Sequence, residues 1–415
     1  MRIVGIDAAI LRAPRPRPYW GTSGVVVQKR PGYERTDPFA DLSAVYPPRW
    51  RNEASYPRDL TTLLVRLTTE DGITGIGESK APVGPRGVRM LFDELYRDLL
   101  LGQSSEDVHP IMERILGLMR IRGHVQGFHQ EIASGIDIAL WDIKGKRARQ
   151  PVANLLGGQF CRQIRVYASG LPGLSSGAPS TEVEALQQQA SEVLEKGYRA
   201  VKVALGAGIE ADVRSVAAVR DVIGPDVTLL TDAVGSYDVD TSLRLANRLT
   251  AYNVAWLEAP LPFDDLEGYV DVSKRSPIPI ACDVVWVPSL VRQLLQRGAR
   301  IIFQPEVLKA GGISVCKHIA DLADTFGLPF APHVSQGSVI QFAASLQVAA
   351  ASPNFLICEF PWREEAMGNV LLKNPLQFDQ SCLAVPQEPG LGIELDPEAL
   401  DKVLVPEAET VRDPR

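Results

Sequence analysis

From about residue 160 onward, short apolar runs alternate with longer segments in which apolar residues recur at helical spacing. The starts of successive apolar runs are 22 to 36 residues apart, and the runs are 164–168, 200–204, 227–231, 254–257, 278–282, 300–303, 328–331 and 355–359. Segments between them, such as 182–196 and 209–223, have the periodicity of amphipathic helices. Eight strand–helix units in succession predict a (β/α)₈ TIM barrel, whereas a doubly wound open sheet would not call for eight similar repeats.

The first 150 residues follow a mixed pattern. Strands are predicted at 3–11, 61–69 and 74–78, and Asp71-Gly72 is a strong hairpin signal between the last two. Helical periodicity marks 88–100, 108–118 and 132–147. The segment between residues 14 and 60 is rich in Pro, Arg and aromatic residues and has no clear period. It is too long for an ordinary connection, so a functional lid and a floppy insert both stay open.

Composition narrows the class of protein. The chain has 415 residues, of which 45% are apolar and 22% charged, as in soluble globular proteins. The 43 basic and 50 acidic residues give a net charge of −7 without a basic block, so no nucleic-acid partner is expected. No apolar stretch reaches the roughly 18 residues of a membrane span. Five irregularly spaced cysteines favour a reducing compartment, and we expect a cytoplasmic protein without a membrane partner.

Carboxylates stand at the ends of three successive predicted strands. These are Asp232, Glu258 and Asp283, separated by 26 and 25 residues. In a barrel, the carboxyl ends of the strands meet at one rim, where function is expected. Three carboxylates placed together repel one another unless a hard cation lies among them, and oxygen ligands suit Mg²⁺. The sequence therefore predicts a magnesium site, although single acidic residues in loops are common.

Four further predicted strands carry candidate catalytic residues. Lys202 alternates with apolar neighbours, so it points to the other side of its strand and can stabilise negative charge on a substrate; a snorkelling surface Lys is the alternative. Glu306 and His333 follow the sixth and seventh runs, and a carboxylate beside an imidazole forms a proton-transfer pair. Glu359 ends the eighth run.

The chain resembles the mandelate racemase/muconate-lactonizing group of the enolase superfamily. The matching stretches include Gly135-Ile136-Asp137 through Lys146, Pro151 to Gly158, Trp256-Leu257-Glu258-Ala259-Pro260, Gln304 to Ile313 and Ala331-Pro332-His333. The resemblance implies an α/β protein with a modified TIM barrel, residues 156–374, and an α+β capping domain, residues 1–155 completed by 375–415. It also implies a small carboxylate substrate, Mg²⁺, removal of the proton α to the carboxylate, and a homo-oligomer.

The resemblance assigns roles by position. Asp232 and Glu258 match the first two metal ligands, and Asp283 falls where the muconate-lactonizing branch places its third. Lys202 matches the first Lys of a Lys-x-Lys motif, and His333 matches the base on the seventh strand. In the resemblance, Glu359 donates a hydrogen bond to the substrate carboxylate when it is protonated.

Three positions depart from the family pattern. Ala204 replaces the second Lys, Glu306 replaces an Asp, and Asp283-Val284 replaces Gly-Glu. Two-base racemisation needs a base on each face of the carbanion, so Ala204 favours syn dehydration of a polyhydroxy acid to a 2-keto-3-deoxy acid, with His333 as base and acid. A racemase, epimerase or cycloisomerase, and an eroded member that only binds ligand, remain alternatives. The segment 14–60 contains Arg30, Arg35, Arg49 and Arg51. These arginines suit an anionic or hydroxyl-rich substrate; the alternative is that they only keep the surface soluble.

Overall fold

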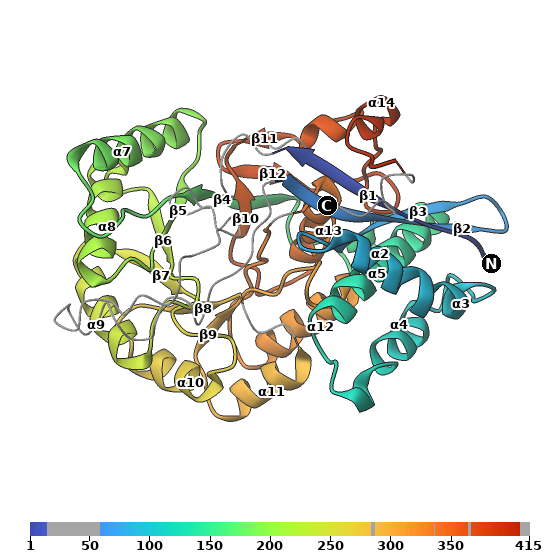
Figure 1. Cartoon of the computed structure of the whole chain (residues 1–415), viewed down its shortest axis with the longest axis horizontal. Coiled ribbons are helices and arrows are strands. Elements are labelled where there is room, and N and C mark those ends of the chain that lie inside the picture. Colours follow the sequence, from blue (N-terminus) through green and yellow to red (C-terminus); the bar gives the residue numbers. More distant parts are fainter. Residues whose placement is uncertain (15–58, 284–286, 336, 364–366, 407–415) are drawn as a thin grey trace, which may run out of the picture.

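A computed structural model describes residues 1–14, 59–283, 287–335, 337–363 and 367–406. An α+β cap lies on one side of a barrel, as Figure 1 shows, with the cap elements β1 to α5 gathered beside α12 and α13. The fold class predicted from the sequence is therefore confirmed. The predicted lid segment lies almost entirely outside the described residues, and so do its four arginines and Val284.

The cap is built on an antiparallel sheet in the order β1–β2–β3, and β2 and β3 form the predicted hairpin, with Thr68 opposite Thr74. Gly72 in the turn has a φ of 82°, a conformation that glycine adopts without steric cost. The elements of the cap are β1 (Ile3–Pro14), β2 (Asp59–Thr69), β3 (Thr74–Lys80), α2 (Pro85–Leu95), α3 (Arg97–Leu100), α4 (Val108–Gly117), η2 (Arg120–Arg122), α5 (Phe128–Ala148) and α6 (Val152–Leu155).

Helix α5 packs unusually closely on β3. A Cβ at Gly77 would lie 1.9 Å from the carbonyl oxygen of Gly135, and one at Gly75 would lie 2.2 Å from that of Ala139. Only glycine therefore permits this approach of helix to strand. The end of β3 in turn contacts the barrel, through Glu78 and Lys80.

The barrel strands run parallel in the order β4–β5–β6–β7–β8–β9, and β10 pairs with β4 to close the ring. Its elements are β4 (Gln163–Leu171), α7 (Ser180–Glu195), β5 (Ala200–Ala204), α8 (Ile209–Ile223), β6 (Thr228–Asp232), α9 (Val239–Leu249), η3 (Thr250–Tyr252), β7 (Val254–Glu258), α10 (Leu266–Arg275), β8 (Ile280–Cys282), α11 (Pro288–Gln296), β9 (Ile301–Phe303), α12 (Gly312–Thr325), α13 (Val339–Ala350) and β10 (Cys358–Pro361).

The seventh predicted strand, 328–331, is the part of the barrel prediction that fails. Within the described chain it forms no ladder, because only Phe330 makes single bridges, to Phe303 and to Phe355. Pro329 within this stretch and Pro332 directly after it lack the N–H that a ladder requires. The segment nevertheless occupies the seventh position of the ring, between β9 and the residues leading into β10.

After the barrel, the C-terminal segment contacts both the barrel and the cap. Its elements are η4 (Asn369–Leu371), β11 (Phe378–Asp379), β12 (Cys382–Ala384) and α14 (Pro397–Asp401). β12 pairs with the start of β4, and Val403 and Val405 exchange backbone hydrogen bonds with β1. The domain boundaries stay a prediction. No helix in the described ranges is long and apolar enough to cross a membrane.

Buried acids of the cap dock it on the barrel. Glu78 on β3 accepts hydrogen bonds from the Ser338 backbone N–H and hydroxyl, both at 2.7 Å, at the start of α13. Asp137 on α5 accepts from the Ser314 N–H at 3.0 Å, in the first turn of α12. Carboxylates favour the positive ends of helices, so these contacts satisfy N–H groups that the helices leave unpaired.

The Asp137 contact predicts a pH-dependent part of the stability. Burial raises the pKa of Asp137 to about 7, although hydrogen bonds from Ser314 oppose the shift. The folded protein then holds a proton that the unfolded chain releases between about pH 4 and about pH 7, so this stabilisation is complete below that window and is lost as the pH rises through it. Asp137→Asn keeps both hydrogen-bonding positions without titrating.

We therefore expect Asp137→Asn to reduce the difference in free energy of unfolding between about pH 4.5 and about pH 7.5, by at most about 4 kcal/mol. Urea denaturation at both pH values measures this difference. Asp226→Asn, at an exposed position, is the matched control. A variant with the same pH dependence as the wild type would show that Asp137 does not hold the proton.

Candidate active site

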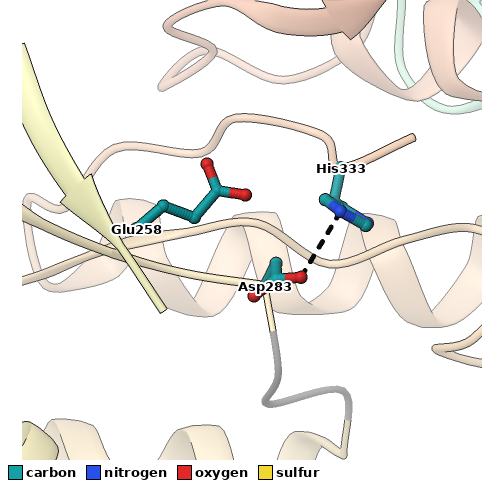
Figure 2. Close-up of side chains that lie close together, drawn as sticks. All are labelled: Glu258, Asp283 and His333. Carbon is teal, nitrogen blue, oxygen red and sulfur yellow. Dashed lines mark ion pairs between the residues drawn. The ribbon is translucent and has the colours of Figure 1, made fainter. Parts of the chain in front are cut away.

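The carboxylates predicted to meet at the barrel rim do meet there. Asp232 ends β6 and lies in register with Glu258 at the end of β7, while Asp283 follows β8. Figure 2 shows the side chains of Glu258, Asp283 and His333 turned toward one another. Parallel strands of one barrel deliver their ends to one rim, which is why residues far apart in sequence become neighbours here.

Lys202 on β5 lies in the middle of these carboxylates. Its ammonium is 2.7 Å from Glu258, 3.0 Å from Glu359 and 3.2 Å from Asp232, and the side chain is fully buried. Burial by itself lowers the pKa of Lys202, but the surrounding carboxylates outweigh it and hold the pKa well above the ordinary value. Lys202 therefore points into the barrel as a permanent cation, and the snorkelling alternative is wrong.

One lysine leaves this cluster short of positive charge. Burial raises the pKa of Glu258 well above its ordinary value; Lys202 opposes the shift, and Asp232 and Asp283 add to it. Burial likewise raises the pKa of Asp232, against Lys202 and with Asp283. A divalent cation would supply the missing charge and keep the carboxylates ionised.

The donor atoms fit such a cation. One ligand atom each from Glu258, Asp283 and His333 lies within 4.8 Å of the others, so the three form a plausible divalent metal site. Asp232, predicted as a ligand, adjoins Glu258 through the strand register and Lys202. Two ligand sets are thus available: Asp232, Glu258 and Asp283, or His333 with Glu258 and Asp283.

Both oxygens of the Glu258 carboxylate accept hydrogen bonds from side chains of the barrel. Its Oε2 accepts hydrogen bonds from Gln304 Nε2 at 2.9 Å and from Trp256 Nε1 at 3.2 Å, while Oε1 accepts from Lys202. These donors orient the carboxylate that adjoins the other ligand candidates. Gln304 and Trp256 lie in the stretches that resemble the family, but nothing in the sequence predicted this role for them.

His333 and Glu306 form the predicted pair. Nδ1 of His333 lies 2.8 Å from Oε2 of Glu306. Burial would raise the pKa of Glu306, but Lys80, Lys309 and His333 hold it well below the ordinary value. An ionised carboxylate only accepts, so Nδ1 donates and Nε2 is left to exchange protons. Nε2 lies 3.3 Å from Asp283 and 3.4 Å from Glu359, both of which stabilise the ring when it is protonated.

Glu306 has partners that sequence reasoning missed. Lys80, the last residue of β3 in the cap, is ion-paired with Oε1, and Lys309 lies 3.4 Å from Oε2. The Ser335 hydroxyl donates to Oε2 at 3.0 Å. Lys80 ends a predicted cap strand, and only the docking of cap on barrel brings it here.

Glu359 differs from the role that the resemblance implied. Burial would raise its pKa, but Lys202, His333 and hydrogen bonds from Ser169 and the Val334 N–H outweigh it, so the pKa of Glu359 is lowered. The surroundings therefore favour the carboxylate over the protonated form that would donate a hydrogen bond. Glu359 acts here as a partner of Lys202 and of His333 Nε2.

Comparison with known proteins agrees with this geometry. Residues 57–157 match the mandelate racemase/muconate lactonizing enzyme N-terminal domain, and residues 185–399 match the enolase C-terminal domain-like family. The chain belongs to the mandelate racemase/muconate lactonizing enzyme family of the enolase superfamily. It is therefore an enzyme of this family, with its candidate site at the rim where the barrel places these residues.

Curated relatives in the family cover most of both chains. The chain is 34% identical to D-galactarolactone cycloisomerase of Agrobacterium fabrum, over 83% of this chain and 92% of the relative. It is 30% identical to arabinonate dehydratase of Saccharolobus solfataricus, over 82% and 89%. It is 32% identical to D-xylonate dehydratase of Haloferax volcanii, over 85% and 87%.

The chain is also similar to solved structures over nearly its whole length. A putative isomerase from Sinorhizobium meliloti superposes with a TM-score of 0.84 at 29% identity, covering 98% of this chain and all of that one. A racemase from Streptomyces coelicolor A3(2) with bound magnesium superposes with a TM-score of 0.79 at 25% identity, covering 97% of this chain and all of that one.

Proposed function

We propose that the protein is a Mg²⁺-dependent acid-sugar dehydratase in which His333 removes the proton α to the carboxylate. The observation that carries the proposal is the His333–Glu306 pair, in which Nδ1 faces Glu306 and Nε2 faces the carboxylates of Asp283 and Glu359. Ala204, which replaces the second Lys of the family pattern, ends β5 in register with Asp232 and offers only a methyl group. A reaction that one base can complete therefore suits this site better than a two-base racemisation.

The proposed reaction is a β-elimination. Nε2 of His333 takes the α-proton, and the electron pair left on Cα forms the Cα–Cβ double bond as the Cβ–O bond breaks. Nε2–H returns the proton to the departing hydroxyl, which leaves as water, so both steps take place on one face of the substrate. The enol then tautomerises to a 2-keto-3-deoxy acid. Glu306 and Glu359 stabilise the imidazolium between the two proton transfers.

Asp232, Glu258 and Asp283 are the proposed ligands of Mg²⁺. A hard cation prefers oxygen over the imidazole nitrogen, and an Nε2 bound to metal would be unable to accept a proton. When bound, Mg²⁺ stabilises the negative charge that develops on the substrate carboxylate. The solved racemase with bound magnesium supports the choice of metal. Lys202, which is ion-paired with Asp232 and Glu258, would contribute a second positive charge beside the metal ligands.

A cycloisomerase is the second candidate, favoured by the 34% identity to D-galactarolactone cycloisomerase. On a lactone of a sugar acid, the same removal of the α-proton by His333 would expel the ring oxygen rather than a hydroxyl. The lactone ring opens and no water is released. The two candidates therefore share the base and differ in the leaving group.

A substrate panel tests the proposal and separates the candidates. Purified protein with Mg²⁺ is incubated with mono- and diacid sugars and with their lactones, and 2-keto acid is measured together with lactone consumption. Turnover of open acids supports the dehydratase, whereas turnover confined to lactones supports the cycloisomerase. If the protein has Mg²⁺ bound and yet neither dehydrates any acid nor opens any lactone of the panel, the proposal is overturned.

The single base predicts the stereochemistry of exchange. In D₂O, we expect unreacted substrate recovered at partial conversion to keep its configuration at Cα, because Ala204 stands where the family pattern has a second Lys and has no group that can donate a proton. Proton NMR and chiral chromatography of the recovered acid measure exchange and configuration. Accumulation of the Cα epimer would show that a second base acts and would favour a racemase or epimerase.

A further inference from the structure

The end of the cap sheet reaches into the catalytic pair of the barrel. Lys80, the last residue of β3, is 4% exposed, and its ammonium is ion-paired with Glu306 Oε1 and lies 2.6 Å from the Ser335 hydroxyl. A lysine is almost never buried unless it is paired. Here both partners belong to the barrel, and one of them is the carboxylate that orients His333.

The contacts on Glu306 divide between its two oxygens. Oε2 receives His333 Nδ1 at 2.8 Å and the Ser335 hydroxyl at 3.0 Å, whereas the cap lysine is bound to Oε1. Lys309 approaches Oε2 at 3.4 Å. Lys80 therefore holds the oxygen that the imidazole does not use, and this contact sets the rotation of the carboxylate. Ser335 contacts both Lys80 and Glu306, which closes a small network around them.

The side chain of Glu306 is long enough to reach Lys80. At the position where the related pattern has Asp, the extra methylene of Glu extends the carboxylate toward the cap, and its outer oxygen meets Lys80. A longer side chain also has one more rotatable bond, so it needs an additional contact to keep a single orientation. Lys80 provides that contact in a buried, low-dielectric setting where an ion pair is strong.

The backbone around Lys80 is anchored to the barrel as well. Two residues earlier on β3, Glu78 accepts hydrogen bonds from Ser338 at the start of α13. Thr62 lies opposite Lys80 in the β2–β3 register and donates to Glu78 at 2.7 Å. The end of β3 is thus fixed on the barrel independently of the Lys80 side chain, so the removal of its ammonium need not release the cap.

We propose that Lys80 is a positioning residue for the His333–Glu306 pair, through which the cap domain holds the base of the barrel in its working orientation. The inference rests on the proposed role of His333 as the base. Lys80 acts through Glu306 Oε1 and does not touch the substrate. The docked cap thereby completes the catalytic pair, a part of the site that the barrel alone does not supply.

Kinetics of Lys80→Met and Lys80→Arg test the proposal in the whole protein. We expect Lys80→Met to lower kcat by about 10- to 100-fold with KM changed by less than about 2-fold, because a misoriented base slows the chemical step rather than binding. Lys80→Arg should recover part of kcat, since it restores a cation to Oε1. Lys317→Met, whose lysine pairs with Asp321 on α12, is the matched control and should leave kcat unchanged.

An NMR measurement tests the effect of Lys80 on the His333–Glu306 hydrogen bond without requiring turnover. In protein labelled with ¹⁵N-histidine, the His333 Nδ1–H proton should give a downfield resonance that is assigned by its absence in His333→Asn. We expect this resonance to shift or disappear in Lys80→Met and to persist in Lys317→Met. If Lys80→Met does not fold by circular dichroism, Lys80→Gln, which keeps a hydrogen-bond donor without the charge, takes its place in both measurements.

The outcomes separate the two proposals. A wild type without turnover overturns the proposed function, yet the NMR comparison still decides whether Lys80 orients His333. Wild-type kcat and an unchanged resonance in Lys80→Met would overturn the positioning role. A variant whose KM rises while kcat and the resonance stay constant would also overturn it, because that pattern belongs to a residue that shapes substrate binding.

Discussion

His333→Asn is expected to lower kcat by about 10³-fold or more, because the variant lacks the only group proposed to take the α-proton and to return it to the leaving group. Asn retains a side chain of similar size between Glu306 and Asp283, so the fold should be kept. The readout is the rate of 2-keto acid formation from the best acid sugar of the panel, with circular dichroism as a check on folding.

The same variant decides between the two ligand sets. If Asp232, Glu258 and Asp283 hold the metal, His333→Asn should bind Mg²⁺ with an affinity within a few fold of the wild type, measured by calorimetry. If His333 is itself a ligand, activity and affinity fall together, and its assignment as the base is wrong. His318→Asn, which changes an exposed histidine on α12, is the matched control and should behave as the wild type.

Asp283→Asn is expected to weaken Mg²⁺ binding by more than about 10-fold and to lower kcat by at least about 10²-fold, since an amide carries no charge toward the cation. Asp283 follows β8 at the rim and is half-buried, so the change should leave the barrel intact. Thermal unfolding gives a second readout: Mg²⁺ should raise the Tm of the wild type and raise that of the variant much less, because a ligand stabilises the state that binds it.

Two further variants sharpen this test. Asp232→Asn should show the same loss of Mg²⁺ affinity if Asp232 is a ligand, whereas an unchanged affinity would leave Glu258, Asp283 and His333 as the ligand set. Asp264→Asn, at an exposed position, should have no effect on affinity or on kcat. Full metal binding by Asp283→Asn would refute the proposed site.

The rim residues could be predicted because the barrel repeats. Each strand end in a (β/α)₈ barrel has the same position relative to the axis, so Asp232, Glu258 and Asp283 could be placed together from their spacing alone. Alternation along β5 likewise predicted that Lys202 points away from its apolar neighbours, and it does. The homo-oligomer stays a prediction.

Two other features differed from what the sequence predicted. The ionised state of Glu359 follows from the distances to Lys202 and His333, and its predicted role as a proton donor does not suit them. The seventh strand was predicted from its apolar residues, but the prolines beside Phe330 prevent a ladder. The role that the resemblance implied for Glu359 was changed by residues distant in sequence, whereas the ladder was prevented by prolines that stand in the sequence itself.

Periodicity and strand spacing, which are properties of the chain itself, determined the barrel, its functional rim and most of the residues on it. The contact between Lys80 and Glu306 was decided only by tertiary structure. The two residues are 226 positions apart, and they meet because glycines on β3 let α5 pack closely while buried acids of the cap dock on barrel helices. Docking of this kind depends on the shape and charge of two folded surfaces, and no sequence period records it.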